Sequence, residues 1–319
     1  MSEKNPGRCS TDQIMVKKNS AAYLKYWLRP RVLVDVSKTD SATTLFGQSV
    51  PFPLCVSPAG IQAMAHPDGE LATSRACAKR GVHMGVSSFS NYSVQDVRAA
   101  GLAVGPLHHV MQLYTMQDRS AQLRIIQRAE EAGCVAIFLT ADSPVLGVRY
   151  NELRNDFRAP EGLALPMLEK TSETVRAQAH DDGFTSFNSD SHSWAKEIPW
   201  LRSVTKMQIW IKGVLTAEDL QLAVQYGCDG VIIDVHIDEG IRSGTDIFKA
   251  LALGAKCVWI GRPITWGLAY HGEAGVTETL DILYNEFRRC MQLCGCKNIA
   301  EITPASLGVV SDNCPLARL

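Results

Sequence analysis

The stretch that decides the fold runs from His109 to Thr140 and reads HVMQLYTMQDRSAQLRIIQRAEEAGCVAIFLT. It begins and ends with short apolar runs, 109–113 and 135–140, that are rich in β-branched and large apolar side chains. Between them, residues 119–132 carry apolar side chains at helical spacing, and Gly133 follows directly. Two apolar runs joined by an amphipathic helix predict two parallel strands with a crossover helix between them.

The same rhythm recurs along most of the chain. The predicted strands are residues 54–57, 82–86, 109–113, 135–140, 208–212, 231–233 and 257–260. The predicted helices are residues 68–80, 119–132, 217–226 and 244–253, each followed closely by a glycine. Strands that alternate with helices in this way predict a parallel sheet closed, or nearly closed, on itself. We therefore expect an α/β fold of the (β/α)8 TIM-barrel type, with one domain over residues 1–319.

Three segments depart from the repeat. Residues 1–18 are polar and carry no periodicity, so we expect an N-terminal segment outside the barrel. Residues 160–193 are polar and fall between the fourth and fifth strands, which predicts a lid or a flexible loop over the carboxyl ends of the strands. Residues 278–293 are expected to form the last outer helix.

Composition excludes several classes of protein. Hydrophobic residues make up 46% of the 319 residues and charged residues 20%, so the chain can bury a large core. The 32 Lys and Arg residues nearly balance the 33 Asp and Glu residues, with no basic block, so neither a nucleic acid nor a membrane is expected as a partner. The ten cysteines lack the spacing of metal ligands, and no metal is expected.

Polar residues follow the predicted strands, at the end of a barrel where enzymes of this architecture place their chemistry. Together with other segments of the chain, these residues resemble the family of FMN-dependent 2-hydroxy acid oxidases and dehydrogenases, typified by glycolate oxidase. The segments that carry the resemblance are residues 29–35, 63–70, 112–114, 139–144, 211–214, 244–255 and 260–263. The similarity extends from about Ser20 to the C-terminus.

The resemblance implies an FMN site at the strand ends. Pro58, Ala59 and Gly60 would lie along the flavin ring, while Ser87, Gln112 and Thr140 would contact its polar edge. Lys212 would stand near the ring nitrogen N1 and the C2 carbonyl, where an ammonium stabilises the negative charge of the reduced ring. The residues expected around the phosphate are Asp238, Gly240, Arg242, Gly261 and Arg262.

The resemblance also implies a substrate site for a small 2-hydroxy acid. Tyr114 and Arg149 would bind its carboxylate, with Tyr114 also counted among the catalytic residues. His236 is the residue that the family's motif offers as the base, and Asp142 would orient it. A tryptophan often found in the family two residues after Ser87 is replaced here by Phe89.

The sequence departs from the family around His236. Residues 230–246 begin like the family's sixth strand and finish like its seventh, and the segment Ser-Asn-His-Gly-Gly-Arg is missing. Read forward from Gly230, His236 takes the position of the catalytic histidine; read backward from Gly244, it falls within the seventh strand. A parallel crossover needs a dozen or more residues, so both readings cannot hold. We therefore expect a barrel that lacks one βα unit, with either a changed strand tilt or an open seam.

Three functions remain open from the sequence. The chain is an FMN oxidoreductase of a 2-hydroxy acid, a tailoring oxidase in a biosynthetic pathway, or an inactive or truncated flavoprotein that has lost its base. Molecular oxygen or another acceptor would reoxidise the flavin, and a homo-oligomer is expected. The residues Ala317-Arg318-Leu319 resemble a peroxisomal address, which predicts a peroxisomal rather than a cytoplasmic location.

Overall fold

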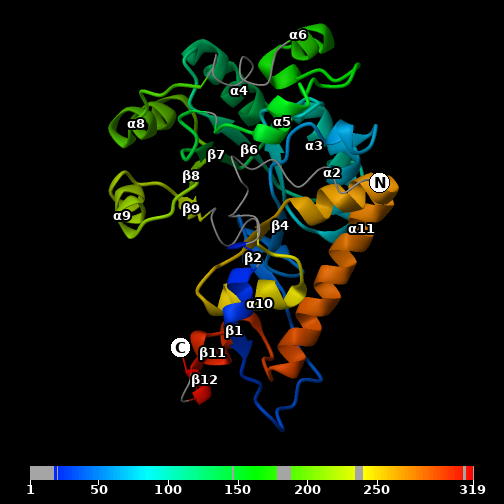
Figure 1. Ribbon diagram of the computed structural model, residues 1–319, viewed down its shortest axis with the longest axis vertical. Coiled ribbons are helices and arrows are strands. Elements are labelled where there is room, and N and C mark those ends of the chain that lie inside the picture. Colours follow the sequence, from blue (N-terminus) through cyan, green and yellow to red (C-terminus); the bar gives the residue numbers. More distant parts are fainter. Residues whose placement is uncertain are drawn as a thin grey trace.

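The computed structural model describes residues 18–19, 21–145, 147–177, 188–233, 240–311 and 314–318. Its centre is a curled parallel sheet of seven strands with helices packed around the outside (Figure 1). The strands are β4 (Leu54–Val56), β5 (Met84–Ser87), β6 (His109–Tyr114), β7 (Ala136–Thr140), β8 (Gln208–Lys212), β9 (Gly230–Ile232) and β10 (Val258–Ile260). All seven predicted strands are confirmed, with small shifts at their ends.

The strand order is β10-β4-β5-β6-β7-β8-β9, and every neighbouring pair is parallel. This is the order of a barrel in which each strand pairs with the next one along the chain, and β10 returns to pair with β4. Among the described residues no ladder joins β9 to β10, so the sheet stays open between them. The TIM-barrel fold that lacks one βα unit, expected from the sequence, is thereby confirmed, and the lost unit leaves a seam.

Helices cover the outer face of the sheet (Figure 1). The longer ones are α2 (Gly69–Arg80), α3 (Val94–Leu102), α4 (Arg119–Ala132), α8 (Trp194–Val204), α9 (Ala217–Gln225), α10 (Gly244–Ala252) and α11 (Arg262–Leu293). The shorter ones are α5 (Tyr150–Arg154), α6 (Ser172–Ala177), η1 (Tyr23–Lys25), η2 (Gln62–Met64), η3 (Pro166–Leu168), η5 (Ile299–Glu301) and η6 (Pro304–Ser306). None of the helices in the described part of the chain has the length and apolar character needed to cross a bilayer.

Local sequence explains where several helices end. Gly81 and Gly133 follow α2 and α4 with φ angles of 63° and 84°, and glycine adopts this left-handed conformation without steric cost. The last helix departs from expectation because α11 begins at Arg262 rather than near residue 278. Non-helical angles at His271 and Gly272 divide it into two helical parts. The predicted helix is the second of these parts.

Two small antiparallel sheets lie outside the barrel. Strands β2 (Thr43–Leu45) and β3 (Gln48–Val50) form a hairpin. Strands β1 (Tyr26–Leu28), β11 (Leu307–Ser311) and β12 (Cys314–Arg318) form a sheet near α10, in which residues 26–28 lie beside the C-terminal strands (Figure 1). The described parts of the expected lid are residues 160–177 and 188–193; the first carries η3 and α6, and Met167 is buried there beside α3.

Candidate active site

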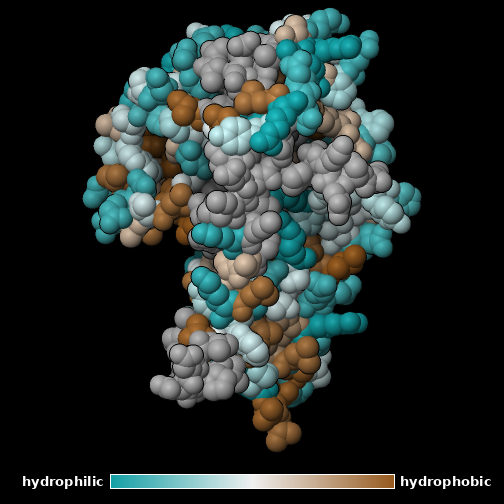
Figure 2. Space-filling view, viewed as in Figure 1, coloured by the Kyte–Doolittle hydropathy of each residue, from teal (hydrophilic) through white to brown (hydrophobic). Residues whose placement is uncertain are grey.

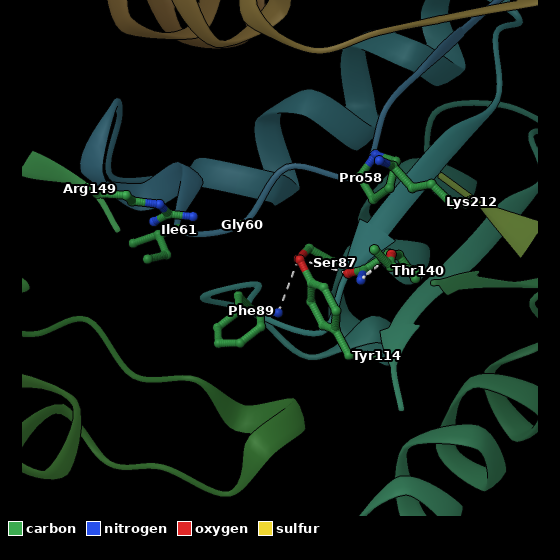
Figure 3. A pocket seen from close by; sticks show the side chains of 10 residues that line it. Pro58, Gly60, Ile61, Ser87, Phe89, Tyr114, Thr140, Arg149 and Lys212 are labelled. Carbon is green, nitrogen blue, oxygen red and sulfur yellow. Dashed lines mark hydrogen bonds between the residues drawn. The ribbon is translucent and has the colours of Figure 1, made fainter. Parts of the chain in front are cut away.

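A cavity of about 170 Å³ lies at the carboxyl ends of the strands; we call it the strand-end cavity (Figure 3). It is lined by ten residues: Pro58, Gly60, Ile61, Ser87, Phe89, Gln112, Tyr114, Thr140, Arg149 and Lys212. Eight of the ten are residues that the sequence singled out; Ile61 and Phe89 are the other two. Parallel strands end at one face of the barrel, and this brings together residues up to 154 positions apart, from Pro58 to Lys212.

One wall of the cavity is a buried hydrogen-bonded row on β5, β6 and β7. The amide nitrogen of Gln112 donates to the Thr140 hydroxyl at 2.9 Å, and its amide oxygen accepts from the Ser87 hydroxyl at 3.3 Å. The backbone N–H of Ser88 donates to the same oxygen at 3.3 Å. These contacts fix the orientation of the Gln112 amide, so the wall presents donors and acceptors in a defined pattern.

Two cationic side chains reach the cavity from opposite sides (Figure 3). Lys212 is the last residue of β8, so the ladder with β7 fixes its backbone. Arg149 stands at the start of α5, and its guanidinium pairs with Glu152 at 3.3 Å. Both side chains of this pair are mostly buried, which leaves Arg149 a defined direction. The cavity therefore has cationic groups at two separate places, one of which is paired with Glu152.

The loop after β4 passes very close to the loop after β5. A Cβ atom at Gly60 would stand 2.7 Å from the Cβ of Phe89, so only glycine fits there without movement. Ile61 has a φ of 55°, an uncommon conformation for a β-branched residue, and its N–H donates to the Phe89 carbonyl at 2.9 Å. Phe89 also packs edge-on against Tyr114, with ring centroids 6.0 Å apart. The two loops therefore form one rigid side of the cavity.

A buried carboxylate holds these loops in place. Glu70, fully buried at the start of α2, accepts from the backbone N–H of Gln62 at 3.1 Å and of Asn91 at 3.2 Å. Burial raises the pKa of the Glu70 carboxyl, and the two N–H donors oppose that shift. Glu70 was not among the residues predicted for the site. A charged residue among the small residues of α2 is the signal that could have revealed it.

Asp142 does not line the strand-end cavity. It lines a neighbouring cavity of about 630 Å³, together with His192 and Glu197, and packs against Gly213. Ala59 does not line the strand-end cavity either, although its carbonyl accepts from the Gln62 side chain at 3.1 Å. Two predicted residues, His236 and Asp238, lie outside the described residues.

The four remaining predicted residues lie at or just before the starts of two helices. Gly261 and Arg262 start α11 directly after β10. Gly240 and Arg242 precede α10, where carboxylates accept from the backbone N–H groups. Asp246 accepts from Arg242 and Ser243 at 3.0 Å each, and Glu286 accepts from Gly244 at 2.8 Å. These three amides are therefore already bonded to carboxylates of the protein itself.

The family comparison matches the chain in two segments that meet near His236. A family model described as FMN-dependent dehydrogenase matches residues 7–236 and 233–309. The chain belongs to this family. The two matched segments meet and overlap at 233–236, which agrees with the two registers found in the sequence around His236. The resemblance seen in the sequence is confirmed, and the cofactor of this family member is FMN.

Several characterised relatives cover most of the chain. Glycolate oxidase 3 of Arabidopsis thaliana is 39% identical over 325 aligned positions, which cover 92% of this chain and 87% of the relative. Oxidase FUB9 of Fusarium oxysporum f. sp. lycopersici is 38% identical, covering 94% and 85%. Because 92% of 319 residues is about 293, about 30 of the 325 positions have no residue in this chain. Taken together, these positions are numerous enough to account for a βα unit.

Solved structures of the same family share the fold. A soluble mutant of the membrane-associated (S)-mandelate dehydrogenase from Pseudomonas putida matches with a TM-score of 0.83 and 29% identity, over 94% of this chain and 92% of that one. A mandelate oxidase bound to (S)-4-hydroxymandelic acid matches with a TM-score of 0.82 and 28% identity, over 97% and 93%. The fold of the family therefore persists here despite the open seam.

The strand-end cavity fits the flavin ring of FMN. Its polar row of Ser87, Gln112 and Thr140 can exchange hydrogen bonds with the ring's polar edge, and Lys212 lies beside that row. Gly60, which has no side chain, leaves backbone exposed to the cavity where it passes close to Phe89. The volume of about 170 Å³ is below the ~300 Å³ of most ligand pockets, so it accounts for part of the cofactor only.

Proposed function

We propose that this member of the family oxidises a small 2-hydroxy acid to the corresponding 2-oxo acid. The observation that carries the proposal is the placement of Arg149 and Lys212 on opposite sides of one cavity, with Tyr114 between them. A carboxylate substrate and a reducible ring each need a positive partner, and the cavity offers one for each. When bound, FMN accepts the two electrons that the substrate loses.

The chain's own residues would position the substrate. The guanidinium of Arg149 would bind the carboxylate of the hydroxy acid, and the hydroxyl of Tyr114 would donate to the same group. Phe89, packed against Tyr114, would keep water from one side of the reacting carbon. Lys212 would place its ammonium where negative charge develops, at the end of β8.

The same residues would hold the cofactor and move the proton. Ser87, Gln112 and Thr140 would bind the ring, and Gly261 with Arg262 the phosphate. His236 would accept the substrate's proton on an imidazole nitrogen, and Asp142 would orient it. The side chain of Asp142 lines the neighbouring cavity and not the strand-end cavity, so His236 would have to approach from that side.

The test is anaerobic reduction of the FMN-loaded protein by glycolate, lactate and longer 2-hydroxy acids, followed at the flavin's visible absorbance band. We expect bleaching by at least one of them, and its loss in His236→Ala. Dithionite reduction of the same sample shows that the flavin is intact. Flavin that dithionite bleaches and no hydroxy acid does would identify an inactive flavoprotein, which is the alternative function.

The electron acceptor, the location and the assembly are further parts of the proposal. Oxygen as acceptor would give one hydrogen peroxide per 2-oxo acid, which a coupled peroxidase assay measures. The Ala317-Arg318-Leu319 sequence supports a peroxisomal location, where peroxide is removed. Changing Leu319 to Ser in a fluorescently tagged protein should then release it to the cytosol. Family resemblance supports a homo-oligomer, which sedimentation velocity measures.

A further inference from the structure

A second cavity occupies the seam where the barrel stays open. It has a volume of about 510 Å³ and lies between β9 and the segment that leads into β10, beside the β2–β3 hairpin; we call it the seam cavity. It shares no lining residue with the strand-end cavity. Figure 2 shows the surface indented on this side, between the part that carries α9 and the part that carries α10.

The lining of the seam cavity is largely apolar and aromatic. Trp210, Trp259 and Phe46 contribute rings, and Leu45, Cys55 and Cys257 add smaller apolar surfaces. The rings belong to one cluster around Phe138, with centroid separations of 4.8 Å from Phe138 to Trp259 and 5.9 Å to Trp210. In a complete barrel, side chains of the missing strand would fill this space. The lost unit has therefore left an aromatic slot.

Charge at the cavity is already compensated. Asp229 lines it, but its carboxylate accepts from Arg202 at 2.6 Å and from the Ile209 backbone at 2.7 Å. Lys256, the other charged residue of the lining, is exposed to solvent. Of the two charged residues in the described lining, one is already paired and the other is exposed, so this lining favours a neutral ligand.

The strand edges supply a few polar groups. Val258 donates to Pro53 and Ile260 accepts from Ser57, so Trp259 between them directs its backbone groups away from β4. By the same alternation Gly230 directs its backbone groups away from β8, and no described strand pairs with it on that side. A mostly apolar cavity with a few hydrogen-bonding groups is the usual form of a small-molecule site.

We propose that the seam cavity binds a neutral, mostly apolar small molecule with an aromatic ring system. Apolar walls hold water poorly, and a dry void of this size is unfavourable, so a ligand that fills it gains both burial and ring contacts. Trp210 lines the seam cavity and Lys212, two residues further along β8, lines the strand-end cavity. The rings of Phe138, Trp210 and Trp259 therefore separate the bound molecule from the strand-end cavity. The site is therefore separate from the one that binds the hydroxy acid.

The experiment uses N-phenyl-1-naphthylamine, a neutral aromatic probe, in equilibrium dialysis against the FMN-loaded protein. We expect one saturable site per chain that excess glycolate does not displace. Leu45→Trp fills the cavity from the hairpin and should weaken binding at least tenfold. Leu220→Trp, the same change on the exposed surface of α9 outside the cavity, should leave binding unchanged.

Retention of FMN by each variant shows that it has folded. If Leu45→Trp does not retain FMN, Cys257→Leu replaces it as the filling variant, with the same expected loss. Three results would overturn the proposal: no saturable binding, binding that glycolate displaces, or binding that a folded filling variant leaves unchanged. If the absence of binding is accompanied by dimer formation, a second copy of the chain fills the seam in place of a small molecule.

Discussion

The strands β5 to β7 and the seam between β9 and β10 form one sheet and yet differ in how they are built. In the first region every strand pairs on both sides and is buried along almost its whole length. In the second region β9 pairs on one side and two of its three residues are only half-buried. The polar ends of β5 to β7 line the strand-end cavity, while the seam holds an apolar one.

The difference shows which properties of a barrel survive the loss of a unit. Each βα unit places its own strand-end residue, so Ser87, Gln112 and Thr140 meet whether or not the circle closes. Closure requires that the number of strands and their stagger agree, so the loss of one strand leaves the sheet open at the seam. The hydrogen-bonded wall of the strand-end cavity is therefore a local property, and closure is a property of the whole barrel.

Acidification should have the largest effect, because it acts on the fully paired region. Burial lowers the pKa of His83 to about 4 and that of His109 to about 3, from 6.5. With the folded pKa below the unfolded one, the stabilisation is present above pH 6.5 and is lost as the pH falls toward 4 and then 3. One pKa unit corresponds to about 1.4 kcal/mol, so we expect a loss of several kcal/mol in the free energy of unfolding. Urea unfolding between pH 7 and pH 4.5 measures it.

A variant separates these histidines from the rest of the protein. The imidazole of His83 accepts from the backbone N–H of His108 at 3.1 Å and contacts the Leu45 carbonyl at 3.3 Å. His83→Gln keeps a polar side chain at this place but removes the group that titrates. Its stability should fall less steeply with pH below 6.5 than that of the unchanged protein. An identical slope in the two proteins would show that His83 does not cause the acid sensitivity.

The next effect concerns chemistry at the strand ends. Lys212→Met should slow anaerobic flavin reduction by about 100-fold or more, because a fixed positive charge is lost where negative charge develops. Stopped-flow absorbance measures the rate. Lys206→Met, before the start of β8 and away from the cavity, is the control and should reduce at the normal rate. Equal rates for Lys212→Met and the control would remove Lys212 from the proposed chemistry.

A matched pair of substitutions compares the two regions directly. Val110→Ala in β6, fully buried between two partner strands, should cost about 2–3 kcal/mol in the free energy of unfolding. Val231→Ala in β9, half-buried beside the seam, should cost about 1 kcal/mol. Urea unfolding of both gives the comparison. Equal costs would mean that the seam is packed as tightly as the paired strands.

The smallest effect concerns the buried carboxylate behind the loops. Glu70→Gln keeps one acceptor oxygen for the N–H groups of Gln62 and Asn91 but removes the charge, so we expect about 1–2 kcal/mol less stability and weaker FMN binding. Ultrafiltration of the loaded protein measures the free FMN. Glu131→Gln on the outer surface of α4 should retain FMN normally. FMN retention by Glu70→Gln equal to that control would mean that the loops do not need the charge.

Much of the fold could be predicted because the strands and several helix ends depend on patterns of neighbouring residues. The seven strands follow from apolar runs, and helix ends such as the one at Gly133 follow from glycine's access to positive φ. The missing unit could also be read directly, since residues 230–246 are too short to hold two strands and a crossover. The division of α11 was not predicted, although the break lies at Gly272, whose positive φ is the same glycine signal that ends other helices.

The sequence by itself determined the fold class, the family and most of the strand-end residues that line the strand-end cavity. These depend on spacing of a few residues and on the rule that parallel strands end together. Only the tertiary structure decided that Arg149 reaches the cavity opposite Lys212, that Asp142 lines the neighbouring cavity, and that the lost unit leaves an aromatic space beside Trp210 and Trp259. The physical reason is that these relations join distant segments, and their positions follow from how the whole sheet curls and packs.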